Sequence, residues 1–577
     1  MGEPLSYEDT SPAAGVVLAR PDVSVLRTKR GAWIGVGAAS FTVKGAAAFE
    51  AVSALLGRSD GSRTGHDLLD EFPAGARPAL SRVLEALAAK GCVTFLDAPM
   101  SQYIADRGPA SEWLIPYFAQ LTDEPLRALD RMLTTTVHLY GGPDWLGRLR
   151  RLLDASPLFG LRAEFHAVSE EDGLPRWEDA GLVVIDADSL PHERIVGLQD
   201  ALLDRGVPHG IVGEVGGQHW ILWSDDKSTG CWNCLRRYGR TAESSAAAET
   251  MSPAPDECTA AAVLHAIYQR SAGLGEHSPA AVAMPLNPGP PMVKQHPAWS
   301  VAGCRCHRAV VPPAGGDRRD DTGPALVRRN IVSPDDDSRL DDVHEQIIDV
   351  LAGWTDEFAG PFRHLDGGDL PQVPFGQARA AILVGRADQC RVREISAATL
   401  SSREALYQAA LNAIELYAEQ VDGPRPNRAA GWTLDEAIYR ALLRRSLLLP
   451  ADDAELTSVS GHEECVRFSR YIQRGVARAG GPVPSRWFGA RLANGIYRVA
   501  GHDAGNVLTR GAGACYAEAL STALLRLVND EGVLVPVNPH SPTWAEVWQH
   551  IARPEWVEVT ARTVPFARHQ VRLVEVR

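Results

Sequence analysis

Two close cysteine pairs constrain the fold of this 577-residue chain more than any other feature of its sequence. The first pair is Cys231 and Cys234, and the second is Cys304 and Cys306, which His307 follows directly. Thiolates from two distant loops can complete one tetrahedral zinc site, which pins the loops together and contributes to folding. We therefore expect one structural Zn²⁺ held by these pairs.

The fourth ligand of this site stays open at the level of sequence. The spacing Cys-Arg-Cys is tighter than the usual Cys-x-x-Cys, so either Cys306 or His307 can complete the set. Buried free thiols are a simpler alternative. A catalytic cysteine is a third interpretation, but neither pair lies in a recognisable Cys/His hydrolase context.

The composition and the absence of certain motifs argue against several classes of function. The net charge of −14 argues against nucleic acid, because phosphate binding needs a concentrated basic surface. The sequence has no apolar run of about 18 residues, which would predict a membrane span, and it does not start like a secretory signal, so we expect a cytoplasmic protein. Gly-Lys-Ser/Thr is absent, which excludes P-loop ATPase chemistry.

The pattern of the first hundred residues is that of a winged helix. Its third helix carries too few basic residues for a DNA-recognition helix, which speaks against a zinc-containing transcription regulator. We expect strands at 22–28, 33–38, 40–44 and 92–96 and helices at 46–56, 65–72 and 77–90.

The phrase GAAAFEAVSALLG at 45–57 resembles the PqqD-like leader-recognition domains of peptide natural-product pathways. In that family the third strand and third helix form a groove, into which the leader of a precursor peptide adds a β-strand. The resemblance assigns the leader contacts to Phe41, Val43, Lys44, Arg77, Leu80 and Leu84.

From residue 134 the pattern becomes α/β. Expected strands at 134–139, 182–186 and 210–215 alternate with helices at 148–154 and 194–205, which predicts a parallel doubly wound sheet. The phrase LVVIDADSLPHER and the run that leads to Cys231 resemble ThiF-like adenylating domains.

Two departures from the ThiF-like pattern imply a scaffold that has lost ATP adenylation. The phosphate loop between Gly141 and Gly147 contains Pro143 and the bulky Trp145 in place of Gly-x-Gly-x-x-Gly. The family's Asp-Asn signature is altered to Asp188-Ser189. The simpler interpretation of Asp186 and Asp188 is that they are solvated acids capping the next helix.

The C-terminal part is expected to be α+β, after a charged, Pro/Gly-rich linker at 311–342. Segments 403–417, 431–444 and 511–526 resemble helices of the YcaO fold, whose active members use ATP and Mg²⁺ to phosphorylate a backbone amide. Asn412, Arg444 and Arg526 stand where acids are expected, although Glu415 remains. Arginine cannot supply an oxygen ligand to magnesium. A generic α+β domain is the alternative.

Together the segments resemble the ThiF-like (ocin-ThiF-like) partner protein of the azole-forming cyclodehydratases of thiopeptide and related pathways. The resemblance implies a multidomain α/β protein without catalytic residues of its own. It would bind a ribosomal precursor's leader and activate a separate YcaO cyclodehydratase that uses the ATP and Mg²⁺ to make thiazolines or oxazolines. An ATP-dependent adenylating enzyme acting on a carboxylate is the alternative, and a homodimer stays open. The expected domains are 17–100 (winged helix), 101–310 (ThiF-like), 311–342 (linker) and 343–577 (degenerate YcaO-like).

Overall fold

The computed structural model divides into two compact units, which are described separately. The first unit is Met1–Pro191, Val207–Val212 and Ala254–His277, and the second is His192–Gly206, Gly213–Pro253 and Ser278–Arg577. The structure describes residues 14–37, 39–155, 160–168, 177, 180–224, 230–242, 256–274, 281–285, 295–304, 306, 338–385, 390–450, 454–456, 463–528, 534–537, 543–567 and 570–577.

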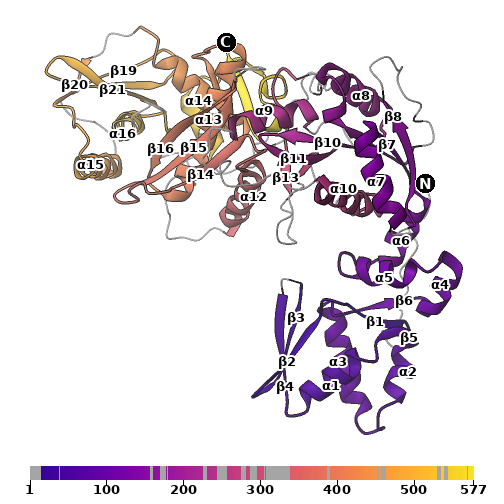
Figure 1. The fold of residues 1–577 in the computed structure, drawn as a ribbon. Helices are drawn as coiled ribbons and strands as arrows, with labels where there is room; N and C mark the ends of the chain where they lie inside the picture. The colour runs from indigo at the N-terminus through magenta and orange to yellow at the C-terminus, as the bar shows by residue number, and fades with distance from the viewer. Residues whose placement is uncertain are drawn as a thin grey trace. The chain divides into compact units, whose positions relative to one another are not determined.

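The first unit begins with two small antiparallel sheets and three helices, which include the strands and helices that the sequence predicts there (Figure 1). One antiparallel sheet has the order β2-β3-β4, and a second, β5-β1-β6, includes two strands that the sequence pattern did not predict, β1 and β5. The elements are β1 (Val16–Ala19), β2 (Ser24–Thr28), β3 (Gly31–Val36), β4 (Ala39–Lys44), α1 (Ala48–Leu56), β5 (Asp60–Thr64), α2 (Gly65–Asp70), α3 (Arg77–Ala89) and β6 (Val93–Leu96).

Helical periodicity predicts which residues of α3 are buried in the core of these first elements. Leu80, Leu84 and Leu87 recur at the spacing of one helix face on α3, and all three are at most 6% exposed. They pack in one cluster with Val52 and Leu55 of α1. These contacts fix α1 and α3 beneath the β2–β4 sheet.

Three helices connect the first elements to the next sheet along the chain, and a fourth, α10, comes later in the sequence and contacts one of them. The Tyr117 hydroxyl lies 2.6 Å from Nε2 of His265, which ties two of these helices together. The helices are α4 (Met100–Arg107), α5 (Ser111–Ala119), α6 (Pro125–Thr134) and α10 (Asp256–Ser271). In the described part of the chain, no helix has both the length and the hydropathy that a membrane crossing requires.

The parallel sheet that the sequence predicts is present. Strands β7, β8, β9 and β10 pair in parallel, and all five residues of β9 are buried, as is usual where helices cover both faces. The whole sheet has the order β13-β12-β11-β10-β9-β7-β8, with β11, β12 and β13 antiparallel. Its elements are β7 (Thr136–Gly141), α7 (Pro143–Ala155), β8 (Arg162–Ala167), β9 (Leu182–Asp186), α8 (His192–Arg205), β10 (His209–Val215), β11 (Gln218–Ser224), β12 (Ala281–Pro285) and β13 (His296–Ala298).

The C-terminal part of the second unit is α+β, as expected. Three antiparallel sheets have the orders β14-β15-β16, β17-β23-β22 and β18-β19-β20-β21. Their strands are β14 (Phe362–Asp366), β15 (Gly376–Val384), β16 (Arg391–Thr399), β17 (Arg428–Gly431), β18 (Ala454–Glu455), β19 (Arg486–Arg491), β20 (Tyr497–Asp503), β21 (Asn506–Gly513), β22 (Trp556–Glu558) and β23 (Arg572–Val576).

Long helices accompany these sheets. The first begins at Ser338, so the end of the expected linker at 311–342 is helical, while 311–337 lie outside the described residues. The main helices are α12 (Ser338–Trp354), α13 (Ser402–Asp422), α14 (Leu434–Ser446), α15 (Glu463–Arg478) and α16 (Tyr516–Arg526).

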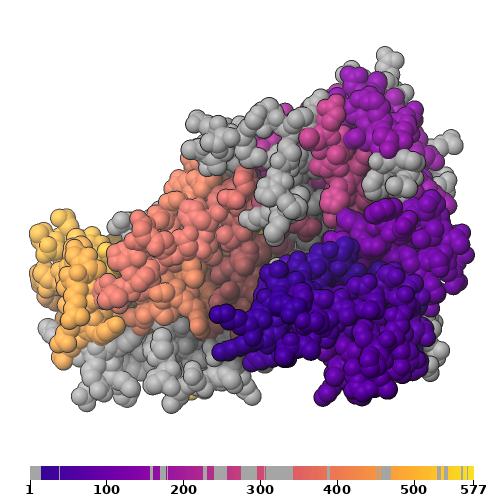
Figure 2. Space-filling model, turned by 60° about the horizontal axis from the view of Figure 1, so that its bottom comes forward, coloured from indigo at the N-terminus to yellow at the C-terminus, as the bar shows by residue number. Residues whose placement is uncertain are grey.

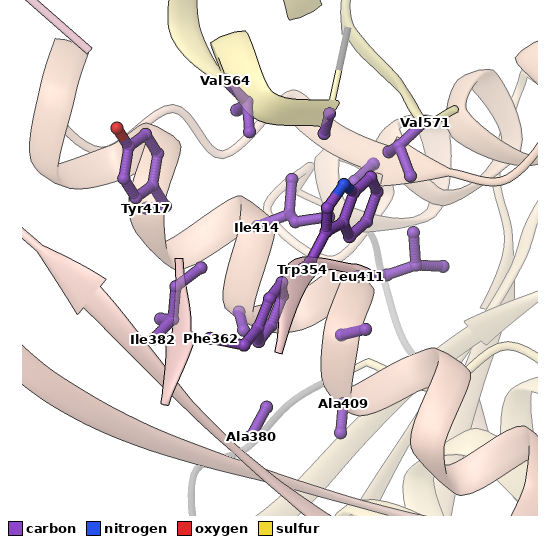
Figure 3. Close-up of a cluster of buried hydrophobic side chains, with 14 of the residues drawn as sticks. Trp354, Phe362, Ala380, Ile382, Ala409, Leu411, Ile414, Tyr417, Val564 and Val571 are labelled. Atoms are coloured by element: carbon purple, nitrogen blue, oxygen red, sulfur yellow. The ribbon is translucent and has the colours of Figure 1, made fainter. Parts of the chain in front are cut away.

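The main apolar core of this part surrounds α13 (Figure 3). Trp354 and Phe362 are at most 1% exposed, and their rings are stacked with centroids 6.3 Å apart. Val564 and Val571, near the end of the chain, complete the cluster. The Tyr417 ring lies at the edge of the cluster and its hydroxyl points away from the apolar side chains. The hydroxyl accepts a hydrogen bond from the backbone near the second cysteine pair.

Candidate functional site

The four cysteines of the two pairs come together in the second unit, and all are buried. The Sγ atoms of Cys231 and Cys234 are 3.7 Å apart, those of Cys231 and Cys304 3.4 Å, and those of Cys234 and Cys306 3.6 Å. Four thiolates around one zinc at about 2.3 Å have sulfur–sulfur edges of about 3.8 Å. The four sulfurs can therefore hold one tetrahedral metal ion. His307 lies outside the described residues.

The surroundings of the sulfurs favour the thiolate form that a metal requires. The backbone N–H of Val301 donates to Sγ of Cys234 at 3.3 Å, and the Asn233 side chain donates to Sγ of Cys304 at 3.5 Å. The hydrogen-bonding thiols, Cys231 first, hold the pKa of Cys304 far below its usual value, whereas burial raises the pKa of Cys234 well above it. Burial thus disfavours the charged form of Cys234 in the absence of an ion, and a dication would stabilise it.

The cysteine site packs directly on the C-terminal part of the second unit. The backbone N–H of Ala302 donates to the Tyr417 hydroxyl at 2.8 Å. The Arg363 guanidinium lies 5.8 Å from the centroid of the Tyr238 ring and donates to the carbonyl of Tyr238. Leu383 of β15 belongs to the same buried cluster as the cysteines. A metal here would therefore stabilise the loop that meets α13.

Side chains that follow strand β9 occupy a backbone donor of the loop at 141–147, which is expected to have lost phosphate binding. The Gly142 N–H donates to Oγ of Ser189 at 2.9 Å, and that hydroxyl donates to the Asp186 carboxylate. A Cβ atom placed on Gly141 would lie 2.6 Å from the Trp145 ring. An N–H that could receive a phosphate is thus used internally, which is consistent with loss of adenylation.

The prediction that Asp186 caps the next helix is confirmed, but its solvation was wrong. Its carboxylate accepts the N–H of Asp188 at 3.1 Å, at the start of a short 3₁₀ helix, Ala187–Ser189. Asp186 is only 4% exposed. Burial raises its pKa above the usual range, because the charged form is poorly solvated.

A buried cluster of charge joins α13 and α14. Arg440 is 1% exposed, and its guanidinium donates to the Glu415 carboxylate at 3.1 Å and to the Asn412 side-chain oxygen at 2.8 Å. Gln408 also accepts from Arg440, and Arg444 forms a second ion pair with Glu415. The guanidinium groups of Arg440 and Arg444 therefore neutralise Glu415, the acid of α13 that remains in the YcaO-like pattern.

Arg526 stands at the third position where the YcaO resemblance expects an acid, and it too lacks a carboxylate. It donates to the carbonyl of Arg510 at 2.9 Å. Burial lowers its pKa, and the nearby charges of Arg444 and Arg510 lower it further. Arg440 was not singled out from sequence, although it lies one helical turn before Arg444 and so on the same helix face.

One buried acid of this part was not predicted as a site. Glu518 of α16 accepts the Tyr439 hydroxyl at 2.5 Å and the N–H of Ala514 at 2.7 Å. Burial raises its pKa to about 7. Its position in a GAGACYAEAL phrase was the available signal, but the phrase gives no partner in space.

The residues expected to contact a leader peptide divide between the core and the surface. Phe41 and Val43 face the core from β4, and Lys44 is exposed. Leu80 and Leu84 are 6% and 2% exposed in the core, so they do not form a groove wall as expected. Arg77 forms an ion pair with Asp70 and donates to the Phe72 carbonyl at 2.9 Å.

Among the described residues, the outer edge of β4 has no neighbouring strand. The sheet ends at β4, whose ladder partner is β3. The Gly45 N–H donates to the Arg30 carbonyl at 2.9 Å, so in the antiparallel alternation the backbone groups of Ser40, Thr42 and Lys44 point away from β3. This strand belongs to the indigo surface in Figure 2.

Comparison with known proteins gives the fold. No family model matches the chain, and no curated protein does. A solved heterocyclase in complex with substrate and cofactor is 12% identical, covers 97% of this chain and 94% of its own, and has a TM-score of 0.53. The chain shares the fold of a heterocyclase. The heterocyclase TruD, 13% identical over 97% of this chain and 94% of its own, has a TM-score of 0.44. E. coli MccB with AMPCPP and MccA, 12% identical over 50% of this chain and 98% of its own, has a TM-score of 0.35.

Proposed function

We propose that this chain is the leader-binding and activating subunit of an ATP-dependent cyclodehydratase. In this role it recruits a ribosomal precursor peptide to a separate YcaO-family enzyme, which forms thiazolines or oxazolines. The fold supports the proposal, because the similar heterocyclase is described as bound to substrate and cofactor. The PqqD-like and ThiF-like resemblances of the sequence supply the division of roles.

The observation that carries the peptide-binding role is the open edge of β4. Backbone groups of Ser40, Thr42 and Lys44 point outward, where an extended peptide can add a strand. The side chains of Phe41 and Val43 alternate with them and are half-buried. Leader affinity would come from backbone pairing, and the exposed Lys44 would mainly affect association rate and its salt dependence.

The activating rather than catalytic role is supported by the buried arginines. Arg440 and Arg444 already neutralise Glu415, so this carboxylate is not free for magnesium. An active heterocyclase is the second candidate, favoured by the full-length fold similarity. A carboxylate-adenylating enzyme is the third, and the Gly142–Ser189 hydrogen bond speaks against it.

A metal at the four cysteines would be structural in this proposal. Cys231, Cys234, Cys304 and Cys306 would hold Zn²⁺, whose closed set of four protein ligands leaves no position for substrate. The ion would supply stability to the loop that carries Ala302 against Tyr417. ATP and Mg²⁺ would be used by the partner enzyme.

Leader binding is tested by removing one outward N–H. Thr42→Pro deletes that donor at an edge position and leaves the β3–β4 hydrogen bonds intact, so leader binding should weaken by at least ~10-fold in fluorescence anisotropy. Thr42→Val is the matched control, because it keeps the N–H and should bind normally. Equal affinity of both variants, or of a chain lacking residues 1–100, would exclude the β4 edge.

A further inference from the structure

A second group of metal-ligating side chains lies in the first unit, on two neighbouring parallel strands. His138 of β7 is paired in register with Glu164 of β8, and Tyr140 is paired with His166. Residues that alternate along a strand face the same side of the sheet, so His138, Glu164 and His166 lie together. The side chains of Glu164 and His166 are partly exposed, so solvent reaches the group from their side.

The donor atoms of these three side chains are close together. Nδ1 of His138 lies 3.1 Å from Nε2 of His166, and each nitrogen lies 3.6 Å from Oε2 of Glu164. The imidazole planes are parallel within 2° and their centroids are 5.2 Å apart, so the two rings are stacked. Ligands at about 2.0–2.1 Å from a tetrahedral zinc are separated by about 3.3 Å. The spacing thus fits one shared ion after a small rotation of the rings.

The rings are held in place by their environment. The Tyr140 ring stacks on His166 with centroids 4.6 Å apart. The His138 side chain is only 9% exposed, so burial restricts the motion of its ring.

We infer that His138, Glu164 and His166 form a second divalent-metal site, separate from the four cysteines. Two imidazoles and one carboxylate suit a late first-row ion such as Zn²⁺. The cysteine site presents four buried ligands, whereas this one presents three, with His166 36% and Glu164 57% exposed. Three protein ligands leave a position for water or an oxygen ligand, as in zinc sites that exchange ligands.

The test uses the full chain equilibrated with buffered Zn²⁺ at micromolar free concentration. Wild type should hold one equivalent more than His166→Ala and Glu164→Gln, and calorimetry should show this equivalent weakened by at least ~10-fold in both variants. Cobalt(II) separates the sites, because thiolate charge-transfer bands report the cysteines. Those bands should be unchanged in both variants while the total cobalt content falls.

A matched control pair lies elsewhere in the chain. His364 is 3.5 Å from Glu394 on the surface, as a pair without a third ligand in the described structure, so His364→Ala should keep the full metal content. Glu164 is exposed, which makes Glu164→Gln a variant that folds normally. Equal metal content of wild type, Glu164→Gln and His166→Ala would overturn the second site.

Discussion

The guanidinium of Arg440 lies 3.1 Å from the carboxylate of Glu415, and the two side chains are 1% and 2% exposed. A charge buried this deeply persists only when an opposite charge is close to it. The two guanidinium groups of Arg440 and Arg444 provide that charge without any ion. The acid on α13 is therefore part of the domain's structure.

Replacing Arg440 with Met should destabilise the chain by about 3–5 kcal/mol, because Glu415 loses a buried partner and Gln408 and Asn412 lose a donor. Urea unfolding at neutral pH measures the loss. Arg486→Met is the matched control, since Arg486 and Glu455 form an exposed pair whose loss should leave the urea midpoint almost unchanged. A loss as small as the control's would show that Arg440 is not needed to balance Glu415.

Replacing Cys231 with Ala should remove the metal of the cysteine site and lower the stability of the folded chain. Structural zinc contributes about 10–16 kcal/mol in zinc-finger peptides, and we expect a loss of at least about 3 kcal/mol here. Metal analysis and thermal unfolding measure the two effects. Cys258→Ala is the control, because Cys258 is exposed and lies outside the cluster. Full metal content and stability in Cys231→Ala would contradict the site.

Glu518 should make stability depend on pH. Burial raises its pKa from the ordinary 4.5 to about 7, so the folded state binds the proton more tightly than the unfolded state. Stability should therefore fall as pH rises from about 4.5 to about 7 and stay level above. Glu518→Gln removes this dependence, and its stability relative to wild type should rise by up to about 3 kcal/mol between pH 4.5 and pH 8. Urea unfolding of wild type and Glu518→Gln at both pH values measures this change. An equal stability difference at the two pH values would contradict a raised pKa of Glu518.

Local patterns predicted most of the fold. The periodicity of Leu80, Leu84 and Leu87 placed α3 within one residue of its end, and the apolar run at 182–186 gave β9 with its bounds. The strand β5 was missed, because its residues DGSRT have no apolar alternation. Close spacing within each cysteine pair also made the cluster predictable.

Local sequence patterns could not predict contacts between elements that are far apart in the sequence. Arg440 meets Glu415 only because α13 and α14 pack together, and neither helix pattern reveals that partner. His138 and His166 meet because β7 and β8 pair in one particular register. Periodicity also could not separate core from groove on α3, so Leu80 and Leu84 were placed on a leader surface although they fill the core.

The isolated chain should neither hydrolyse ATP nor form azolines, and rings should appear only when a catalytic YcaO partner is added. Phosphoryl transfer depends mainly on groups that position the phosphates and magnesium. In this chain two such groups already have protein partners. The Gly142 N–H is bound to Ser189, and Glu415 is paired with Arg440 and Arg444. Phosphate release and mass spectrometry of a precursor peptide measure the two activities, each with and without the partner. Metal-dependent ATP turnover by the chain alone, abolished in Glu415→Gln, would instead make Glu415 a working ligand and this chain a catalytic heterocyclase.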